Sequence, residues 1–137
     1  MRLLMINPNT TQAMTDLVVE TARRVKAPET VLSGATGRFG AAYISSRAAS
    51  AIASHAALDA YAEHGHDADV IGLACFGDPG LGGLKELAHQ PVVGMAEASC
   101  LEATAGGRRF AIVTGGERWG PMLEEFVEWL GLKAQLA

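Results

Sequence analysis

Val70-Ile71-Gly72-Leu73-Ala74-Cys75-Phe76-Gly77-Asp78-Pro79-Gly80 is an apolar run that ends in a cysteine and then in turn-forming residues. A short apolar run bounded by Gly and Pro is typical of a strand buried in a parallel sheet. Cys75 would then stand at the carboxyl end of that strand, which is where open α/β sheets bind their ligands. The run therefore predicts a thiol at a ligand site. The alternative is that Cys75 is a small buried core residue, as free cysteines often are.

The residues after the run predict the chemical state of this thiol. Asp78 and Pro79 match the N-cap and the first position of a helix that carries leucines at about every third position. The partial positive charge at a helix N-terminus lowers a thiol pKa from about 8.5 toward neutrality. We therefore expect Cys75 to form a thiolate that acts as a base or a nucleophile. The carboxylate of Asp78 opposes this ionisation unless it is engaged as a cap.

The rest of the chain alternates between apolar runs and helical periodicity. Strands are predicted at residues 2–6, 30–35, 70–75, 91–94 and 110–113, and helices over residues 14–25, 46–65, 81–87, 95–103 and 119–130. Strands and helices that alternate at this spacing form right-handed βαβ units. The sequence therefore predicts an α/β fold with a doubly wound parallel sheet.

Composition and charge indicate which kinds of partner and which cellular compartment to expect. The chain has 137 residues, 49% of them hydrophobic, and a net charge of −4 without a basic patch, which does not favour a nucleic-acid partner. The first apolar run stops at Asn7, too early for a signal peptide, and no later run is long enough for a membrane span. We expect a cytoplasmic protein with reduced thiols. Cys100 falls inside the helix predicted over 95–103, so we assign it to packing.

Two familiar ligand motifs do not apply. The segment His64-Gly65-His66-Asp67-Ala68-Asp69 crowds several possible metal ligands, but it lies at a predicted helix end, where histidine and glycine serve as capping residues. We therefore predict no metal site. The glycine-rich run 77–83 matches neither the phosphate-binding loop nor the dinucleotide-binding fingerprint, so nucleotide binding is not supported.

Two loops are candidates for contact with a ligand. Asn7-Pro8-Asn9-Thr10-Thr11 follows the first strand and is rich in groups that hydrogen-bond a carbonyl or a carboxylate, although simple helix capping explains such residues as well. The loop over 34–40 contains three glycines and is long enough to reach over the sheet edge.

Taken together, these motifs resemble the aspartate/glutamate/hydantoin racemase superfamily, and they are most similar to its hydantoin and allantoin racemase branch. They occur in order along nearly the whole chain. The motifs are Ile6-Asn7-Pro8-Asn9-Thr10, Cys75-Phe76-Gly77-Asp78-Pro79-Gly80-Leu81, Pro91-Val92-Val93-Gly94-Met95-Ala96-Glu97-Ala98 and Ile112-Val113-Thr114.

The resemblance implies a racemase that needs no cofactor and that has two similar α/β lobes with the site between them. Residues 1–108 would be the first lobe, and residues 109–137 would be the first strand and helix of an incomplete second lobe. Each lobe of the family contributes one catalytic cysteine, and the first maps onto Cys75. The residues expected to hold the oxygens of a hydantoin, allantoin or amino-acid-like substrate are Asn7, Asn9, Phe76, Gly77 and Thr114.

The sequence departs from the family at the second cysteine motif, which does not occur within these 137 residues. Cys100 does not replace it, because it precedes the strand predicted at 110–113. Two alternatives therefore stay open. One is a one-cysteine decarboxylase or cis-trans isomerase of the same superfamily, and the other is a non-catalytic, carboxylate-binding lobe. An uncovered apolar surface would favour self-association, so we expect a homo-oligomer.

Overall fold

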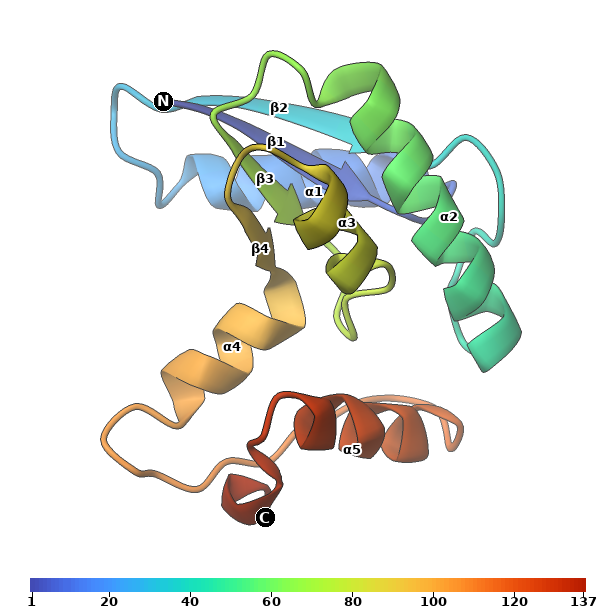
Figure 1. The fold of residues 1–137 in the computed structure, drawn as a ribbon, viewed down its shortest axis with the longest axis vertical. Coiled ribbons are helices and arrows are strands. Elements are labelled where there is room, and N and C mark those ends of the chain that lie inside the picture. The colour runs from blue at the N-terminus through green and yellow to red at the C-terminus, as the bar shows by residue number, and fades with distance from the viewer.

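The computed structural model describes residues 1–137 and contains one four-stranded sheet in the order β2-β1-β3-β4, with all neighbours parallel (Figure 1). The strands are β1 (Arg2–Asn7), β2 (Val31–Thr36), β3 (Val70–Leu73) and β4 (Val92–Gly94). Ile6 of β1 lies opposite Ala35 of β2 and Leu73 of β3, so the strands end at nearly the same level. Four of the predicted strands are confirmed, with bounds shifted by one or two residues.

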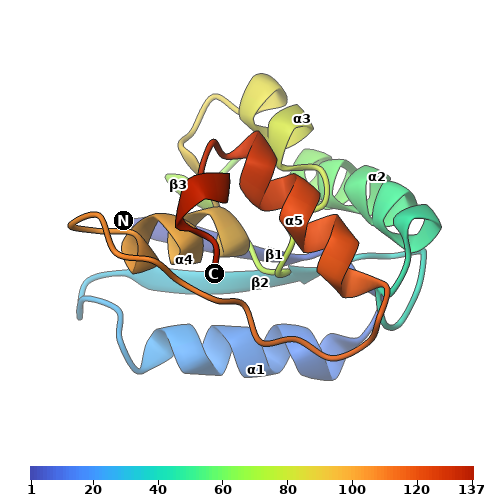
Figure 2. The same ribbon diagram turned by 90° about the horizontal axis from the view of Figure 1, so that it is seen from below.

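Helices cover both faces of the sheet, which confirms the doubly wound α/β fold. Helix α1 (Gln12–Arg23) lies on one face, and α2 (Arg47–His64) and α3 (Leu81–Leu87) lie on the other (Figure 2). Helices α4 (Met95–Ala103) and α5 (Trp119–Trp129) lie beyond the carboxyl ends of the strands (Figure 1). None of the helices is both long enough and apolar enough to span a lipid bilayer.

The core lies between the sheet and α2. Ile6 and Ile71 are fully buried on the sheet, and Leu84 of α3 closes one side. Helix α2 faces them with small residues, of which Ala57 and Ala60 are buried. Because alanine side chains are short, α2 packs close to the strands. Truncation of a core residue such as Ile71 to alanine should cost about 2–5 kcal/mol.

The strand predicted at 110–113 is wrong in extent. Only Phe110 pairs, through a single parallel bridge to Leu136, in which the Phe110 amide donates to the Gln135 carbonyl at 2.9 Å. A 3-10 turn over Lys133–Gln135 brings Leu136 to this position after α5. Val113 is 99% exposed, because no neighbouring strand covers it.

Candidate active site

The carboxyl ends of β1 and β3 form the point at which the sheet reverses its winding. From β1 the chain proceeds to β2 on one side, whereas β3 pairs on the other side of β1 and leads on to β4. In open α/β sheets this reversal creates a crevice for a ligand. Here it holds a cavity of about 390 Å³, and Asn7 at the end of β1 and Cys75 just after β3 both line it. Cys75 is half-buried on the cavity wall.

Most of the residues expected at the site lie together on this cavity. Asn7, Asn9, Cys75, Phe76 and Thr114 all line it. Gly77 does not line this cavity. It lines a neighbouring groove between α2 and α5.

Most of the cavity wall is apolar, and this part was not foreseen from the sequence. Met14 and Val18 belong to the helix predicted over residues 14–25, and in the structure both residues of α1 line the cavity. Two further wall residues, Ala74 and Met95, lie within stretches quoted in the sequence analysis but were not expected at the site. The other wall residues carry no motif that could have identified them, and they are Ala42, Tyr43, Ile44, Trp119 and Leu123.

The turn after Cys75 presents two free backbone donors. Gly77 has a φ of 99°, a left-handed conformation that glycine adopts without strain. The amides of Phe76 and Gly77 make no hydrogen bond within the protein. A Cβ atom at Gly77 would lie 3.2 Å from the ring of Trp119, so glycine at this position also lets α5 approach the turn closely.

The structure contradicts the expectation of a thiolate at Cys75. Helix α3 begins only at Leu81, with Gly80 at its N-cap, so no helix N-terminus starts next to the thiol. Burial, with the nearby charge of Asp78, raises the pKa of Cys75 from 9.0 to about 12. Cys75 is therefore a neutral thiol at neutral pH. Its Sγ lies 3.9 Å from the Phe76 carbonyl oxygen, a contact that suits a thiol donor. Cys100 is buried in α4, as predicted.

The predicted N-cap role of Asp78 in its own helix is also wrong. Its carboxylate accepts hydrogen bonds from the amides of Ala96 at 3.0 Å and Glu97 at 2.7 Å. Both amides belong to the first turn of α4, eighteen and nineteen residues further along the chain. Asp78 therefore caps α4, because the turn after Cys75 directs its side chain away from α3.

Asn7 and Asn9 have different roles in the loop after β1. The Asn7 side chain is 1% exposed, and its Nδ2 donates to Asn9 Oδ1, the Thr11 carbonyl and Thr15 Oγ1 at 2.9, 3.2 and 3.0 Å. Asn7 therefore has no donor left for a ligand. Asn9 Oδ1 also accepts from the Thr11 amide at 2.9 Å, which fixes the orientation of the Asn9 amide. Asn9 lines the cavity, and its Nδ2 makes no hydrogen bond within the protein.

The loop after β2 reaches the cavity and is held at two points. The Thr10 amide donates to the Ala41 carbonyl at 3.2 Å, and Thr11 Oγ1 donates to the Ala42 carbonyl at 2.8 Å. Further back, Arg38 makes a bidentate ion pair with Asp59 of α2. The expectation that residues 34–40 reach over the site is wrong: residues 34–36 belong to β2, none of residues 34–40 lines the cavity, and residues 42–44 do.

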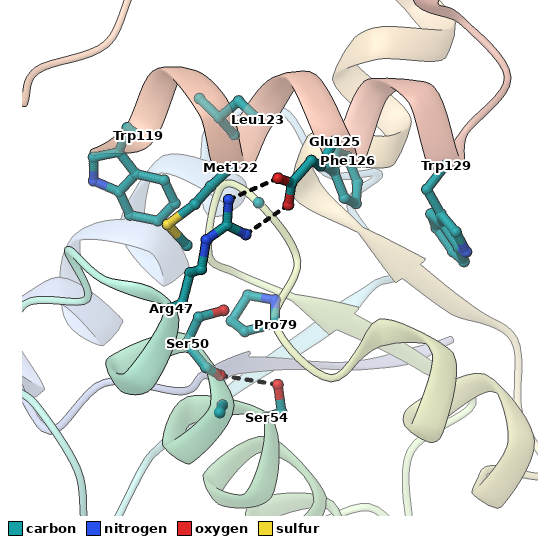
Figure 3. Close-up of a pocket in the computed structure, with 12 residues that line it drawn as sticks. Arg47, Ser50, Ser54, Pro79, Trp119, Met122, Leu123, Glu125, Phe126 and Trp129 are labelled. Carbon is teal, nitrogen blue, oxygen red and sulfur yellow. Dashed lines mark hydrogen bonds and ion pairs between the residues drawn. The ribbon is translucent and has the colours of Figure 1, made fainter. Parts of the chain in front are cut away.

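A second groove of about 440 Å³ separates α2 from α5 (Figure 3). Arg47 at the start of α2 reaches across it to Glu125 of α5. Trp119 and Leu123 of α5 line this groove and also the cavity beside Cys75. Helix α5 is therefore the partition between the two spaces.

The fold and the site define a doubly wound α/β protein with a cysteine at a strand end and amide donors beside it. The chain belongs to the Asp/Glu/Hydantoin racemase family, whose model matches residues 3–137. It is 37% identical to a hydantoin racemase of Paenarthrobacter aurescens and 34% identical to one of Pseudomonas sp. (strain NS671). These alignments cover 100% and 99% of this chain and 59% and 55% of the relatives.

Solved structures agree with this assignment. An allantoin racemase from Pseudomonas fluorescens superposes with a TM-score of 0.94 at 33% identity, over 99% of this chain and 58% of that one. An allantoin racemase from Klebsiella pneumoniae gives a TM-score of 0.93 at 36% identity, over 99% and 56%. The chain thus spans somewhat more than half the length of the relatives it matches.

Proposed function

We propose that this chain carries one half of a racemase site for neutral, hydantoin-like carbon acids, in which Cys75 is the proton donor on one face of the substrate. The observation that carries the proposal is the position of the Cys75 thiol on the cavity wall beside free hydrogen-bond donors. No cofactor is required by this chemistry, because the acidity of the carbon comes from its neighbouring carbonyl.

The reaction follows from inversion at a carbon acid. A base takes the proton from the stereogenic carbon, and the electron pair of that C–H bond moves onto the adjacent carbonyl oxygen to give a planar enolate. The S–H bond of Cys75 then breaks as its proton passes to the opposite face of the carbon. The carbonyl re-forms, Cys75 is left as a thiolate, and exchange with solvent returns both groups to their starting states.

The donors beside Cys75 suit the charge that develops on oxygen. Among the residues that line the cavity, Asn9 Nδ2 and the Phe76 amide have no partner within the protein, and the Thr114 hydroxyl is exposed and also free. Donors that are already fixed where an oxyanion forms contribute about 3–4 kcal/mol each. In this proposal, two or more of these groups hold the enolate oxygen.

A racemase also needs a base on the far face of the substrate. For a reacting carbon at about 3–3.5 Å from each group, the two groups would lie about 6–7 Å apart. Cys100 is buried in α4 and does not line the cavity, and Tyr43 is the only other titratable side chain on its wall. We propose that the opposing base comes from outside residues 1–137.

The cavity wall indicates which substrates fit. No Lys, Arg, His, Asp or Glu lines it, so a free carboxylate or ammonium group would lose hydration without gaining a partner of opposite charge. A neutral ring with amide groups loses less. Met14, Val18 and Trp119 favour an apolar substituent on that ring. Location in the cytoplasm and assembly into a homo-oligomer stay predictions.

One observation supports a second candidate. Because Cys75 is the only thiol on the cavity, the site resembles one that protonates an enolate from a single face. A one-cysteine decarboxylase or isomerase would give a product of one handedness.

Exchange of the substrate proton with solvent deuterium distinguishes these proposals. Each enantiomer of 5-benzylhydantoin is incubated in D₂O with the native residues 1–137 joined to the second half of a hydantoin racemase, which would supply the opposing base, and with Cys75→Ala and Cys100→Ala in the same protein. Both the C5 proton signal and optical rotation are followed. Exchange that depends on Cys75 and proceeds with loss of rotation supports the racemase. Exchange that depends on Cys75 but retains configuration supports the one-sided site. Equal rates for the native chain and Cys75→Ala contradict both, and Cys100→Ala is expected to behave as the native chain does.

A further inference from the structure

Asp78 has an unusual backbone. It is the only residue other than glycine with a positive φ, at 46°. Asp78 is also buried, with 4% of its surface exposed. Left-handed backbone costs a residue with a Cβ about 1–2 kcal/mol, and burial of a carboxylate adds to that cost. A strained, buried acid that persists must make contacts that offset these terms.

The contacts are those with the start of α4. The first amides of a helix lack partners within the helix, and the helix dipole favours an anion there. Gly94, the N-cap of α4, has no side chain, so the Asp78 carboxylate supplies this cap to Ala96 and Glu97. A Cβ atom at Gly94 would collide with the carboxylate of Asp78, so the glycine leaves the space that the cap requires.

The charged and titratable groups around Asp78 offer it no cation. Cys75 lies three residues earlier on the same turn, and Cys100 and Glu97 lie on α4. Glu97 is itself paired with Lys85 of α3. Burial raises the pKa of Asp78, and the hydrogen bonds from Ala96 and Glu97 oppose that shift. The negative charge of Asp78 adds to burial in raising the pKa of both cysteines.

We propose that Asp78 is a positioning residue that fastens the turn after Cys75 to the first turn of α4 and places a negative charge beside the reactive sulfur. One carboxylate thereby fixes the place of the reactive sulfur, and its charge adds to the burial that disfavours the thiolate. This goes beyond the proposed function, since it applies to any reaction in which Cys75 delivers a proton. It also means that the cap and the thiol respond to a single substitution.

The pH dependence of Cys75 alkylation tests the proposal without a substrate. Iodoacetamide modification is followed by peptide mass spectrometry, which separates Cys75 from Cys100. Asp78→Asn removes the charge, and asparagine tolerates the left-handed backbone. We expect the midpoint of the Cys75 profile to fall by about one unit or more, with about tenfold faster alkylation at neutral pH. A midpoint equal to that of the native chain would overturn the proposal.

Two features of this experiment distinguish the effect of the Asp78 charge on Cys75 from the effect of a structure that merely exposes Cys75 more. Greater access to Cys75 raises the limiting rate at high pH, whereas loss of the Asp78 charge moves the midpoint. Glu97→Gln is the matched control, because it removes a carboxylate from the same turn of α4 that is not among the groups acting on Cys75. We expect its midpoint to equal that of the native chain, and a shift as large as that of Asp78→Asn would contradict the specific role of Asp78.

Hydrogen exchange on the unaltered chain tests the cap itself, even if Asp78→Asn folds poorly. The amides of Ala96 and Glu97 are expected to exchange much more slowly than the Gly115 amide, which has no partner within the protein. Exchange of all three at similar rates would show that Asp78 does not hold the start of α4.

Discussion

Arg47 and Glu125 form the one ion pair that joins residues 1–108 to residues 109–137. The two distances are 2.5 Å for Nη1 to Oε2 and 2.7 Å for Nη2 to Oε1, and the pair spans the groove between α2 and α5 (Figure 3). It thereby holds α5 where Trp119 rests against Gly77. An exposed pair contributes little to folding, so we expect its main effect to be on the position of α5.

Loss of this pair should weaken ligand binding more than it lowers stability. With Arg47→Ala, α5 loses its connection to α2, and the cavity wall formed by Trp119 becomes less ordered. We expect weaker binding of 5-benzylhydantoin in a calorimetric titration, a nearly unchanged melting temperature, and recovery in the double exchange Arg47→Glu with Glu125→Arg. Lys133→Ala is the control, because it removes an ion pair to Glu128 that lies within residues 109–137. Equal affinities for Arg47→Ala and the native chain would refute this role.

Substitutions at Asn7 and Asn9, in the loop after β1, should have different effects: one should lower stability and the other should weaken ligand binding. Asn7→Ala leaves Thr15 and the Thr11 carbonyl without their buried donor, so the free energy of unfolding should fall by about 1–3 kcal/mol in urea titrations. Asn9→Asp keeps the acceptor for the Thr11 amide but removes the free Nδ2. It should therefore unfold near the native midpoint and bind a hydantoin less tightly. Equal binding by Asn9→Asp and the native chain would exclude Asn9 as a donor to the ligand.

The raised pKa of Cys75 should make stability depend on pH in the alkaline range. Below pH 9.0 the thiol is protonated in both the folded and the unfolded chain, so its contribution is fully present. Between pH 9.0 and about 12 the unfolded chain releases this proton while the folded chain retains it, so stability falls as pH rises. In Cys75→Ala the decline of the urea midpoint over this range should be shallower than in the native chain. Parallel curves would mean that Cys75 ionises as readily in the folded chain as in the unfolded one.

Two glycines of the segment after Cys75 should respond to alanine in opposite directions. Gly80 has a φ of 87°, and a Cβ there would lie 2.9 Å from the backbone oxygen of Ser54 in α2. Gly80→Ala should therefore cost about 2–4 kcal/mol. Gly82 lies in α3 with open space around it, so Gly82→Ala should stabilise by about 0.5–1 kcal/mol. Urea unfolding measures both, and a neutral Gly80→Ala would show that the turn can move away from α2.

Local patterns in the sequence were sufficient to predict the four strands of the sheet and the position of the Cys75 thiol at a strand end. The apolar run that ends at Cys75 and the polar loop after Ile6 both mark strand ends, and parallel strands place their carboxyl ends at one edge. A serine at position 45 or 46 is a natural cap for the helix predicted over 46–65, and in the structure Ser46 caps α2 by accepting a hydrogen bond from the Ala49 amide. These features depend on residues that are close in the sequence.

The state of the thiol could not be predicted in the same way. The expected thiolate rested on a helix start at Asp78 and Pro79, but the positive φ of Asp78 delays the helix to Leu81 and directs the carboxylate to α4. The two contacts with α4 join residues eighteen and nineteen positions apart, and no periodicity in the sequence encodes them. Likewise, the apolar wall that α5 provides depends on where the chain returns after Gly116, which tertiary packing decides.

The chemistry and the selectivity of this cavity are built from different parts of the chain. The donors and the thiol come from the turn after β3 and the loop after β1, whereas much of the apolar wall comes from α1, α5 and the segment 42–44. Substitutions at wall positions such as Met14, Val18 and Tyr43 can therefore alter which ring substituent is accepted while the reacting groups keep their places. A gene duplicate could drift toward a new substrate by such steps, and a mutant library confined to these positions would follow the same route.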